Sequence, residues 1–334
     1  MEDRIDRLVN LDIGGRGAEG LYQAAREATG GALAMNAARG LVERLKPGDP
    51  ILVTTGFMAR ALVAPSIGET DGPPGTAVLV RALQKTLGVL PVFVTDELLV
   101  PAMGSVLQAA GFSLLDLDEA RQATTPGGRR TASAVLASFP AEDSEAAESA
   151  DTLLEKLHPR FAIAVERPGR NVAGYYHDMR GQGFQAGPAR TDLLMERAQE
   201  LGIPLLAVGD GGNEIGMGLV RDAVMEHVPY GRSCRCPCGR GLAARTRADL
   251  LVTAAVSNWG CYAIVACLAI LKEDASILHT AKAEQRLLAA SARAGLIDSV
   301  SGCVDDGVDG LPAETHMAVV QLLHTMAGQS IAEK

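Results

Sequence analysis

The stretch IPLLAVGDGGNEIGMG, residues 203–218, decides the fold because it contains one complete strand-to-helix transition. Its first part, Ile203–Val208, is an uninterrupted apolar run, which is typical of a strand buried on both faces of a parallel sheet. A glycine-rich loop follows, and we expect a helix over Glu214–Glu226. Parallel strands need helical crossovers of this kind, so the stretch predicts an α/β protein.

The same alternation of strands and helices runs along most of the chain. Apolar runs bounded by turn residues predict strands, and the segments between them have helical periodicity. We therefore expect a mostly parallel sheet with helices on both faces, in three layers. The expected strands are 49–57, 90–97, 112–118, 161–167, 203–210 and 248–258. The expected helices are Gly75–Leu87, Ala141–Leu157, Arg190–Leu201, Glu214–Glu226 and Trp259–Leu271, with others at about 17–45, 280–295 and 312–328.

No clear linker divides the 334 residues, and the sequence contains no internal repeat or low-complexity tract. We predict a single α/β domain over residues 1–334 in preference to two lobes. The least structured stretch is TTPGGRR, residues 124–130, which we expect to form a mobile loop before a helix.

The composition narrows the range of partners. A net charge of −9, without any lysine- or arginine-rich run, argues against nucleic-acid binding, which needs a basic face. The first residues, MEDRIDRLVNLD, hold no apolar signal core, and the apolar stretch Cys261–Leu271 has about half the length of a bilayer span. We therefore expect no membrane partner. Six cysteines without a secreted framework predict a cytoplasmic protein.

Three of those cysteines alternate in SCRCPCGRG, at Cys234, Cys236 and Cys238. The spacing differs from the C-x2-C pairs that are typical of structural zinc sites. We favour a turn with small apolar side chains as the interpretation. In an extended segment the three thiols would share one face, so a redox or soft-metal role is the alternative.

Charged side chains gather in loops at the carboxyl ends of the expected strands, where open parallel sheets bind their ligands. TTGFMAR, TDELLVP, ERPGRN, GDGGNE and SNWG each follow a strand, and GETDGPPG, YYHDMRG and CVDDGVDG lie in nearby loops. Each loop also has a structural interpretation: a helix cap at Thr70 or Asp71, a pair of turns in DDGVDG, a solvated turn in ERPGR. Several acidic loops at one edge together favour a binding site.

The loop of the opening stretch suits a positively charged ligand. It has no G-x-G-x-x-G in the required place, no G-x4-G-K-[ST] and no nearby lysine, so we expect no nucleotide cofactor. Asp210, Asn213 and Glu214 offer oxygen atoms for a hard divalent cation or for the ammonium group of an amino acid. Carboxylates at this position would repel a phosphate.

Six motifs together resemble the D-glutamate cyclase family: ETDGPPG, ERPGRN, MRG, GDGGNEIGMG, VSNWG and DGVDGLP. The resemblance runs from about Ile5 to Met317 and concerns the C-terminal domain of the larger members, so we expect their additional N-terminal domain to be absent here. It implies a hydro-lyase that converts D-glutamate into 5-oxo-D-proline and water. The implied partner is a small acidic amino acid, and assembly into a homo-oligomer stays open.

The implied reaction defines the groups that the site must contain. A base must take a proton from the α-ammonium, and one group, which an arginine can supply, must bind the α-carboxylate. A metal ion or a protonated acid must neutralise the γ-carboxylate and help to expel water. We expect the base among Glu166, Asp210 and Glu214. The expected substrate-binding residues are Arg167, Arg170, Arg180, Asn213, Asn258 and Trp259, and the expected ligands of a Mg²⁺ or Mn²⁺ ion are Glu69, Asp71, Asp210 and Glu214.

Two other classes of function use the same residues. A metal-dependent hydrolase, such as a phosphatase for a small acidic substrate, would use the acidic cluster to hold an ion that activates water. A non-catalytic amino-acid or metal sensor would need the pocket but no base. In all three cases the oxygen-rich loops predict a hard ion in preference to zinc.

Overall fold

A computed structural model describes residues 1–124 and 131–333, in which the strands form one seven-stranded sheet and one short hairpin. The sheet has the order β3-β4-β2-β1-β5-β8-β9, and each neighbouring pair is parallel. The predicted α/β class is therefore confirmed. The sheet strands are β1 (Pro50–Thr55), β2 (Leu90–Thr95), β3 (Ser113–Leu114), β4 (Ser133–Ser138), β5 (Phe161–Val165), β8 (Leu205–Gly209) and β9 (Leu250–Thr253). The hairpin pairs β6 (Tyr176–His177) with β7 (Gly183–Phe184).

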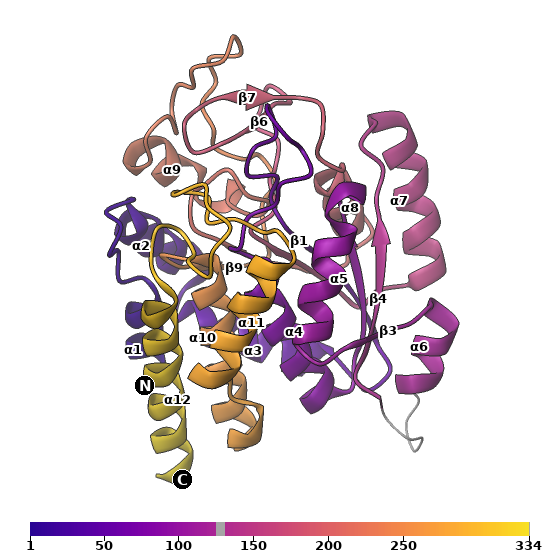
Figure 1. The fold of residues 1–334 in the computed structure, drawn as a ribbon, viewed down its shortest axis with the longest axis vertical. Coiled ribbons are helices and arrows are strands. Elements are labelled where there is room, and N and C mark those ends of the chain that lie inside the picture. Colours follow the sequence, from indigo (N-terminus) through magenta and orange to yellow (C-terminus); the bar gives the residue numbers. More distant parts are fainter. Residues whose placement is uncertain (125–130, 334) are drawn as a thin grey trace.

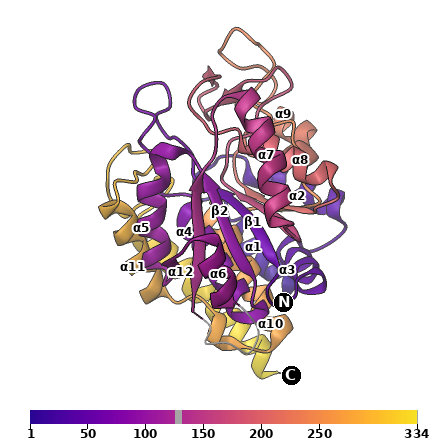
Figure 2. The same ribbon diagram turned by 90° about the vertical axis from the view of Figure 1, so that its right-hand side faces the viewer.

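Helices cover both faces of the sheet and complete the three layers. Figure 2 shows α4, α5, α11 and α12 on one side of the strands and α7 and α8 on the other. The helices are α1 (Glu2–Val9), α2 (Ala18–Thr29), α3 (Leu33–Arg44), α4 (Pro73–Leu87), α5 (Val100–Ala109), α6 (Leu117–Thr124), α7 (Asp143–Leu157), α8 (Thr191–Glu200), α9 (Arg221–His227), α10 (Ser257–Lys272), α11 (Ala281–Arg293) and α12 (Ala313–Ala332).

The apolar helix expected at Trp259–Leu271 is the central helix of one layer. Every residue of α10 from Ser257 to Ile270 is buried, and the helix packs against α3, α4 and α12. A helix that is apolar on all sides needs such neighbours on all sides. Among the described helices, none combines the length and apolarity that crossing a bilayer requires.

Several boundaries differ from those expected. The helix predicted over Glu214–Glu226 is reduced to α9, which follows a short 3-10 turn at Gly218–Val220. Glu214 belongs to the loop because its carboxylate binds loop backbone groups, as described below. The strand predicted over 112–118 is limited to Ser113–Leu114 because α6 starts at Leu117.

Other elements were missed or misplaced. The strand predicted over 248–258 ends at Thr253, so that Asn258 and Trp259 lie in the first turn of α10. The helix predicted over 17–45 is two helices, because Gly30 ends α2 with a φ of 74°. The sequence analysis does not predict α1, α5, α6, β4 or the β6–β7 hairpin. The loop expected at 124–130 lies, apart from Thr124, outside the described residues.

The strand order reverses between β1 and β5. From β1 the chain continues towards β2, whereas from β5 it continues towards β8, on the opposite side. Such a switch point opens a crevice beyond the carboxyl ends of the two strands. In Figure 1 the β6–β7 hairpin and α9 lie above this end of the sheet. The fold therefore predicts a ligand site beneath them.

Candidate active site

A cavity of about 200 Å³ lies at this switch point. Glu166 follows β5 directly and Asp210 follows β8 directly, while Glu69 comes from the loop after β1 and Asp309 from the loop before α12. These four carboxylates, from distant parts of the chain, therefore face one small space, whereas the carboxylate of a fifth lining residue, Asp178, binds the backbone of its own turn. The other lining residues are Arg16, Phe57, Ala59, Arg60, Asp178, Met179, Arg180, Asn213, Ser299 and Val300.

One arginine is the internal counter-ion of this acidic cluster. Arg16 Nη2 lies 2.5 Å from Asp210 Oδ2 and 2.9 Å from Asp309 Oδ2, and it also donates to the carbonyl of Ala255. The side chains of Asp210 and Asp309 are only 6% and 5% exposed. A guanidinium thus sits between two buried carboxylates, where another cation would also be attracted.

Glu166 has the backbone geometry of a constrained residue. Its φ is 42°, in the left-handed region that non-glycine residues rarely adopt, and Asp309 has a φ of 54°. A Cβ on Gly72 would lie 2.7 Å from Glu166 Cβ, so glycine is required there. Glu166 Oε2 accepts a hydrogen bond of 2.6 Å from Ser257 Oγ. Backbone strain of this kind concentrates at functional sites.

Burial and mutual repulsion shift the titration of the acidic cluster. Burial raises the pKa of Glu69 and of Glu166 well above the usual range for glutamate, and neighbouring carboxylates raise both further. Burial, followed by Asp309, raises the pKa of Asp71 to about 8. Burial also raises the pKa of Asp210, although Arg16 opposes the shift. The cluster therefore favours a cation or bound protons at neutral pH.

Glu214 and Asp71 bind backbone rather than the cavity. Glu214 Oε1 accepts hydrogen bonds from the N–H groups of Asp210 and Gly211, and Oε2 accepts one from Gly212, at 2.6–3.0 Å. Asp71 accepts from the first two N–H groups of α10, at 2.8 and 2.9 Å. Both carboxylates therefore hold the backbone around the cavity in place, although neither residue lines the cavity. Their carboxylates are still close to the cavity.

Metal ligation was predicted for Glu69, Asp71, Asp210 and Glu214. Two sets of three carboxylates bring oxygen atoms within 4.8 Å of one another, and Asp210 belongs to both. The sets are Asp71 with Asp210 and Asp309, and Glu166 with Asp210 and Glu214. The donor atoms are all oxygens, which fits Mg²⁺ or Mn²⁺ by chemistry.

The predicted substrate-binding residues divide into two groups. Arg180 and Asn213 line the cavity, whereas Arg167, Arg170, Asn258 and Trp259 do not. All five N–H groups of Arg167 are used, by the carboxylate of Asp96, the hydroxyl of Thr191 and two carbonyl oxygens. No donor of Arg167 is left for a ligand.

The other three residues of the second group have interior partners as well. Arg170 pairs with Asp143 and Asp192. Asn258 Oδ1 accepts from the N–H groups of Gly72 and Gly75, and its amide donates to the carbonyl of Thr70. Trp259 is fully buried and donates to His316 Nδ1 at 2.8 Å. These side chains hold together the loops that carry the carboxylates.

Sequence reasoning missed Arg16, Arg60 and Asp309 as individual residues. Asp309 had a signal, because DGVDGLP was among the motifs. Arg16 had none: it lies in a short GGRG stretch and reaches Asp210 across 194 positions of sequence. Arg16 and Asp210 come together only in the folded chain.

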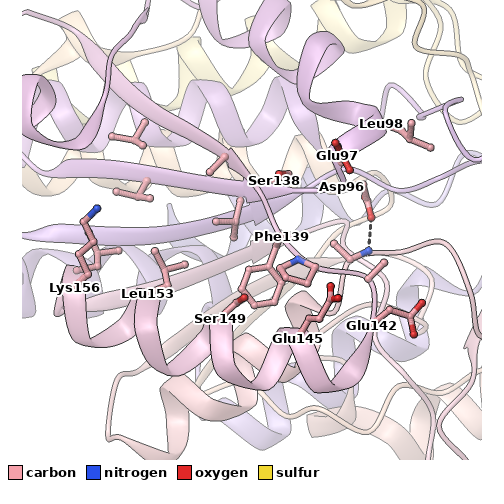
Figure 3. Close-up of a pocket in the computed structure, with 18 of the residues that line it drawn as sticks. Asp96, Glu97, Leu98, Ser138, Phe139, Glu142, Glu145, Ser149, Leu153 and Lys156 are labelled. Atoms are coloured by element: carbon pink, nitrogen blue, oxygen red, sulfur yellow. Dashed lines mark hydrogen bonds between the residues drawn. The ribbon is translucent and has the colours of Figure 1, made fainter.

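A larger cavity lies elsewhere and has a different character. A groove of about 900 Å³ separates α7 from β2 and β4, with Glu142 and Glu145 towards one end and Lys156 at the other (Figure 3). Its walls are mostly apolar, and Asp96 at its edge is already bound to Arg167 and to the N–H of Ala189. Its charged side chains lie towards opposite ends instead of converging on one point, as the residues of a reaction site must. The acidic cavity is therefore the candidate active site.

These observations define an α/β protein with an acidic cavity at the switch point of a parallel sheet. The chain belongs to the family of D-glutamate cyclase-like C-terminal domains, which matches residues 5–324. It is similar to the mitochondrial D-glutamate cyclase of Homo sapiens, with 29% identity over 306 residues. The match covers 82% of this chain and 45% of the human protein, so the chain spans less than half the length of that relative. The resemblance inferred from the motifs is confirmed.

Proposed function

We propose that the acidic cavity binds D-glutamate and cyclises it to 5-oxo-D-proline with loss of water. The observation that carries the proposal is the convergence of Glu69, Glu166, Asp210 and Asp309 on one small cavity. A cluster of this charge attracts the α-ammonium of an amino acid. Membership of the D-glutamate cyclase-like family supports the same substrate.

Glu166 is our choice for the base. Ser257 binds one of its oxygens, and the other is directed to no hydrogen-bond donor among the described residues. Burial raises the pKa of Glu166, which makes its carboxylate a stronger base once it is ionised. Removing a proton from the ammonium leaves an amine that can attack the γ-carboxyl carbon.

The overall reaction neither consumes nor releases protons, but it requires two protons to be transferred from nitrogen to the leaving oxygen. Nitrogen loses two protons when it becomes an amide, and the departing carboxylate oxygen gains two when it leaves as water. Glu69 lines the same cavity and burial raises its pKa, so we choose it as the acid that donates a proton to this oxygen. Arg60 and Arg180 line the cavity and supply positive charge for the carboxylates of the substrate.

A hard divalent ion fits the same cluster. Asp210 and Asp309, with Asp71 behind them, would hold Mg²⁺ or Mn²⁺, with Arg16 as the competing cation. Such an ion would neutralise the γ-carboxylate and polarise its carbonyl.

The test is to incubate the purified protein with D- or L-glutamate and to measure 5-oxoproline by chiral chromatography. Each reaction is run untreated, after EDTA, and after EDTA followed by Mg²⁺, Mn²⁺ or Zn²⁺ alone. We expect product from D-glutamate, loss of activity in EDTA and recovery with Mg²⁺ or Mn²⁺.

Two results would contradict the proposed reaction, and a third would contradict only the divalent ion. Binding of D-glutamate without turnover under every metal condition would favour a sensor. Release of phosphate from a small phosphomonoester, without glutamate turnover, would favour a hydrolase. Full activity in EDTA would be consistent with the cyclase reaction but would show that it needs no divalent ion.

A further inference from the structure

A second cluster of side chains lies above the acidic cavity and plays no part in the proposed reaction. It consists of His177 at the end of β6 and the three cysteines of the SCRCPCGRG segment, Cys234, Cys236 and Cys238. One nitrogen or sulfur atom from each residue lies within 4.8 Å of all the others. We call these four residues the thiol–imidazole cluster.

The spacing of the cluster is close to that of a tetrahedral metal site. The three sulfur atoms lie 3.2, 3.3 and 3.4 Å apart, and His177 Nε2 lies 3.4 Å from Cys236 Sγ and 3.7 Å from Cys238 Sγ. Around a zinc ion with bonds of about 2.3 Å to sulfur and about 2.0 Å to nitrogen, the sulfurs would lie about 3.8 Å apart. Sulfur and nitrogen would lie about 3.5 Å apart.

The chain around the cluster makes room for it. A Cβ on Gly183 would lie 2.6 Å from Cys236 Sγ, so any larger residue in β7 would intrude on the thiols. Asn171 Nδ2 approaches Cys238 Sγ at 3.4 Å, which is the kind of N–H···S contact that supports a thiolate ligand. His177 is fully buried, with Nε2 directed at the sulfurs. The thiols converge on a turn, not on the extended segment that the sequence analysis considered.

We propose that the thiol–imidazole cluster binds one Zn²⁺ ion as a closed, four-coordinate site. Three cysteines and one histidine form one of the usual ligand sets of structural zinc. Sulfur ligands select against Mg²⁺ and Mn²⁺, so this site and the acidic cavity prefer different ions. On binding, the three thiols release their protons to solvent and Zn–S bonds replace the S–H bonds.

The position of the cluster gives the ion a structural role. The turn between β6 and β7 contains Met179 and Arg180, which line the acidic cavity, and Asn213 Nδ2 donates to the carbonyl of His177 at 2.8 Å. Arg235 N donates to the carbonyl of Gly181 at 2.8 Å. Zinc would therefore fix the hairpin over the cavity. This role rests on the proposed function, whereas zinc binding itself does not.

The experiment measures metal directly. Protein expressed in zinc-supplemented medium is analysed by plasma mass spectrometry for wild type, Cys236→Ser and the control Cys303→Ser, an exposed cysteine outside the cluster. We expect about one zinc per chain in wild type and in Cys303→Ser, and a loss of at least about ten-fold in retained zinc in Cys236→Ser. Loss of zinc from both variants would contradict the assignment.

Wild-type protein gives a second measurement that does not depend on a variant folding. After removal of metal under reducing conditions, Co²⁺ is titrated in. Tetrahedral thiolate ligation predicts visible d–d bands and a near-ultraviolet sulfur-to-metal band that saturate at one ion per chain, and Zn²⁺ should displace them. Absence of these bands with free thiols overturns the proposal. So does a metal-free protein, as purified, with a disulfide between two of the three cysteines.

Discussion

Arg16 Nη2 lies 2.5 Å from Asp210 Oδ2, so a residue of the loop between α1 and α2 pairs with the residue directly after β8. Asp12 holds the arginine loop in place by accepting the N–H groups of Arg16, Gly17 and Ala18. The loop therefore closes one side of the acidic cavity. Asp210 is consequently in contact both with Arg16 and with the space that the substrate would occupy.

Asp210→Asn tests the acidic cavity. The amide keeps the size of the side chain and removes its charge, so cyclase turnover should fall by about 10²-fold or more, as for loss of an electrostatic contact to a transition state. The melting temperature should stay close to that of wild type, because the weakened contact with Arg16 is offset by relief of the repulsion from Asp309, Asp71 and Glu214. Steady-state kinetics and a thermal melt measure both. Asp222→Asn, on the exposed side of α9, is the matched control and should change neither. Normal turnover in folded Asp210→Asn protein would remove this residue from the reaction.

Glu214→Gln should show the opposite pattern. Glu214 accepts three backbone hydrogen bonds with its two oxygens, and glutamine would turn an NH₂ group towards one or two of those donors. We expect the free energy of unfolding to fall by about 2 kcal/mol or more, since a buried donor loses its acceptor. Urea denaturation of this variant beside Asp210→Asn measures the difference. Unchanged stability would show that the loop does not depend on this carboxylate.

Arg167→Met should destabilise the protein without a specific effect on substrate binding. The guanidinium and Asp96 are both buried, and removing one partner of a buried ion pair costs about 3–5 kcal/mol. The protein that still folds should bind D-glutamate with an unchanged KM, because none of the five donors faces the cavity. Arg197→Met is the control: its ion pairs with Asp151 and Glu200 are on the surface, so the midpoint of unfolding should hardly move. A raised KM in folded Arg167→Met would restore the role that the sequence predicted.

The success and failure of the sequence predictions follow from the range of the interactions involved. Glu166 and Asp210 could be found because each directly follows an apolar strand, and parallel strands end at one edge. Arg167 was misleading because it follows Glu166 in the same motif, yet its side chain points into the protein and not into the cavity. Arg16 and its partners depend on contacts between distant segments, which no local pattern records. The same is true of His177, which meets the cysteines 57 or more positions away only in the folded chain.

Gly216→Ala and Gly202→Ala together separate the cost of a left-handed backbone from the cost of steric overlap in the stretch 203–218 and its preceding residue. Gly216 has a φ of 100°, and a Cβ there would lie 2.1 Å from Ala207 Cβ in β8, so the loop could not stay against its strand. Gly202 has a similar φ of 78°, but a Cβ there would meet nothing within 4 Å. Gly202→Ala should therefore cost only the left-handed backbone penalty, about 1–2 kcal/mol. Gly216→Ala adds the steric overlap and should cost about 3 kcal/mol or more in total. Urea denaturation of the two variants measures the gap directly. Equal losses would mean that the loop can shift away from β8, and then the carboxylates of Asp210 and Glu214 would not be held where this structure has them.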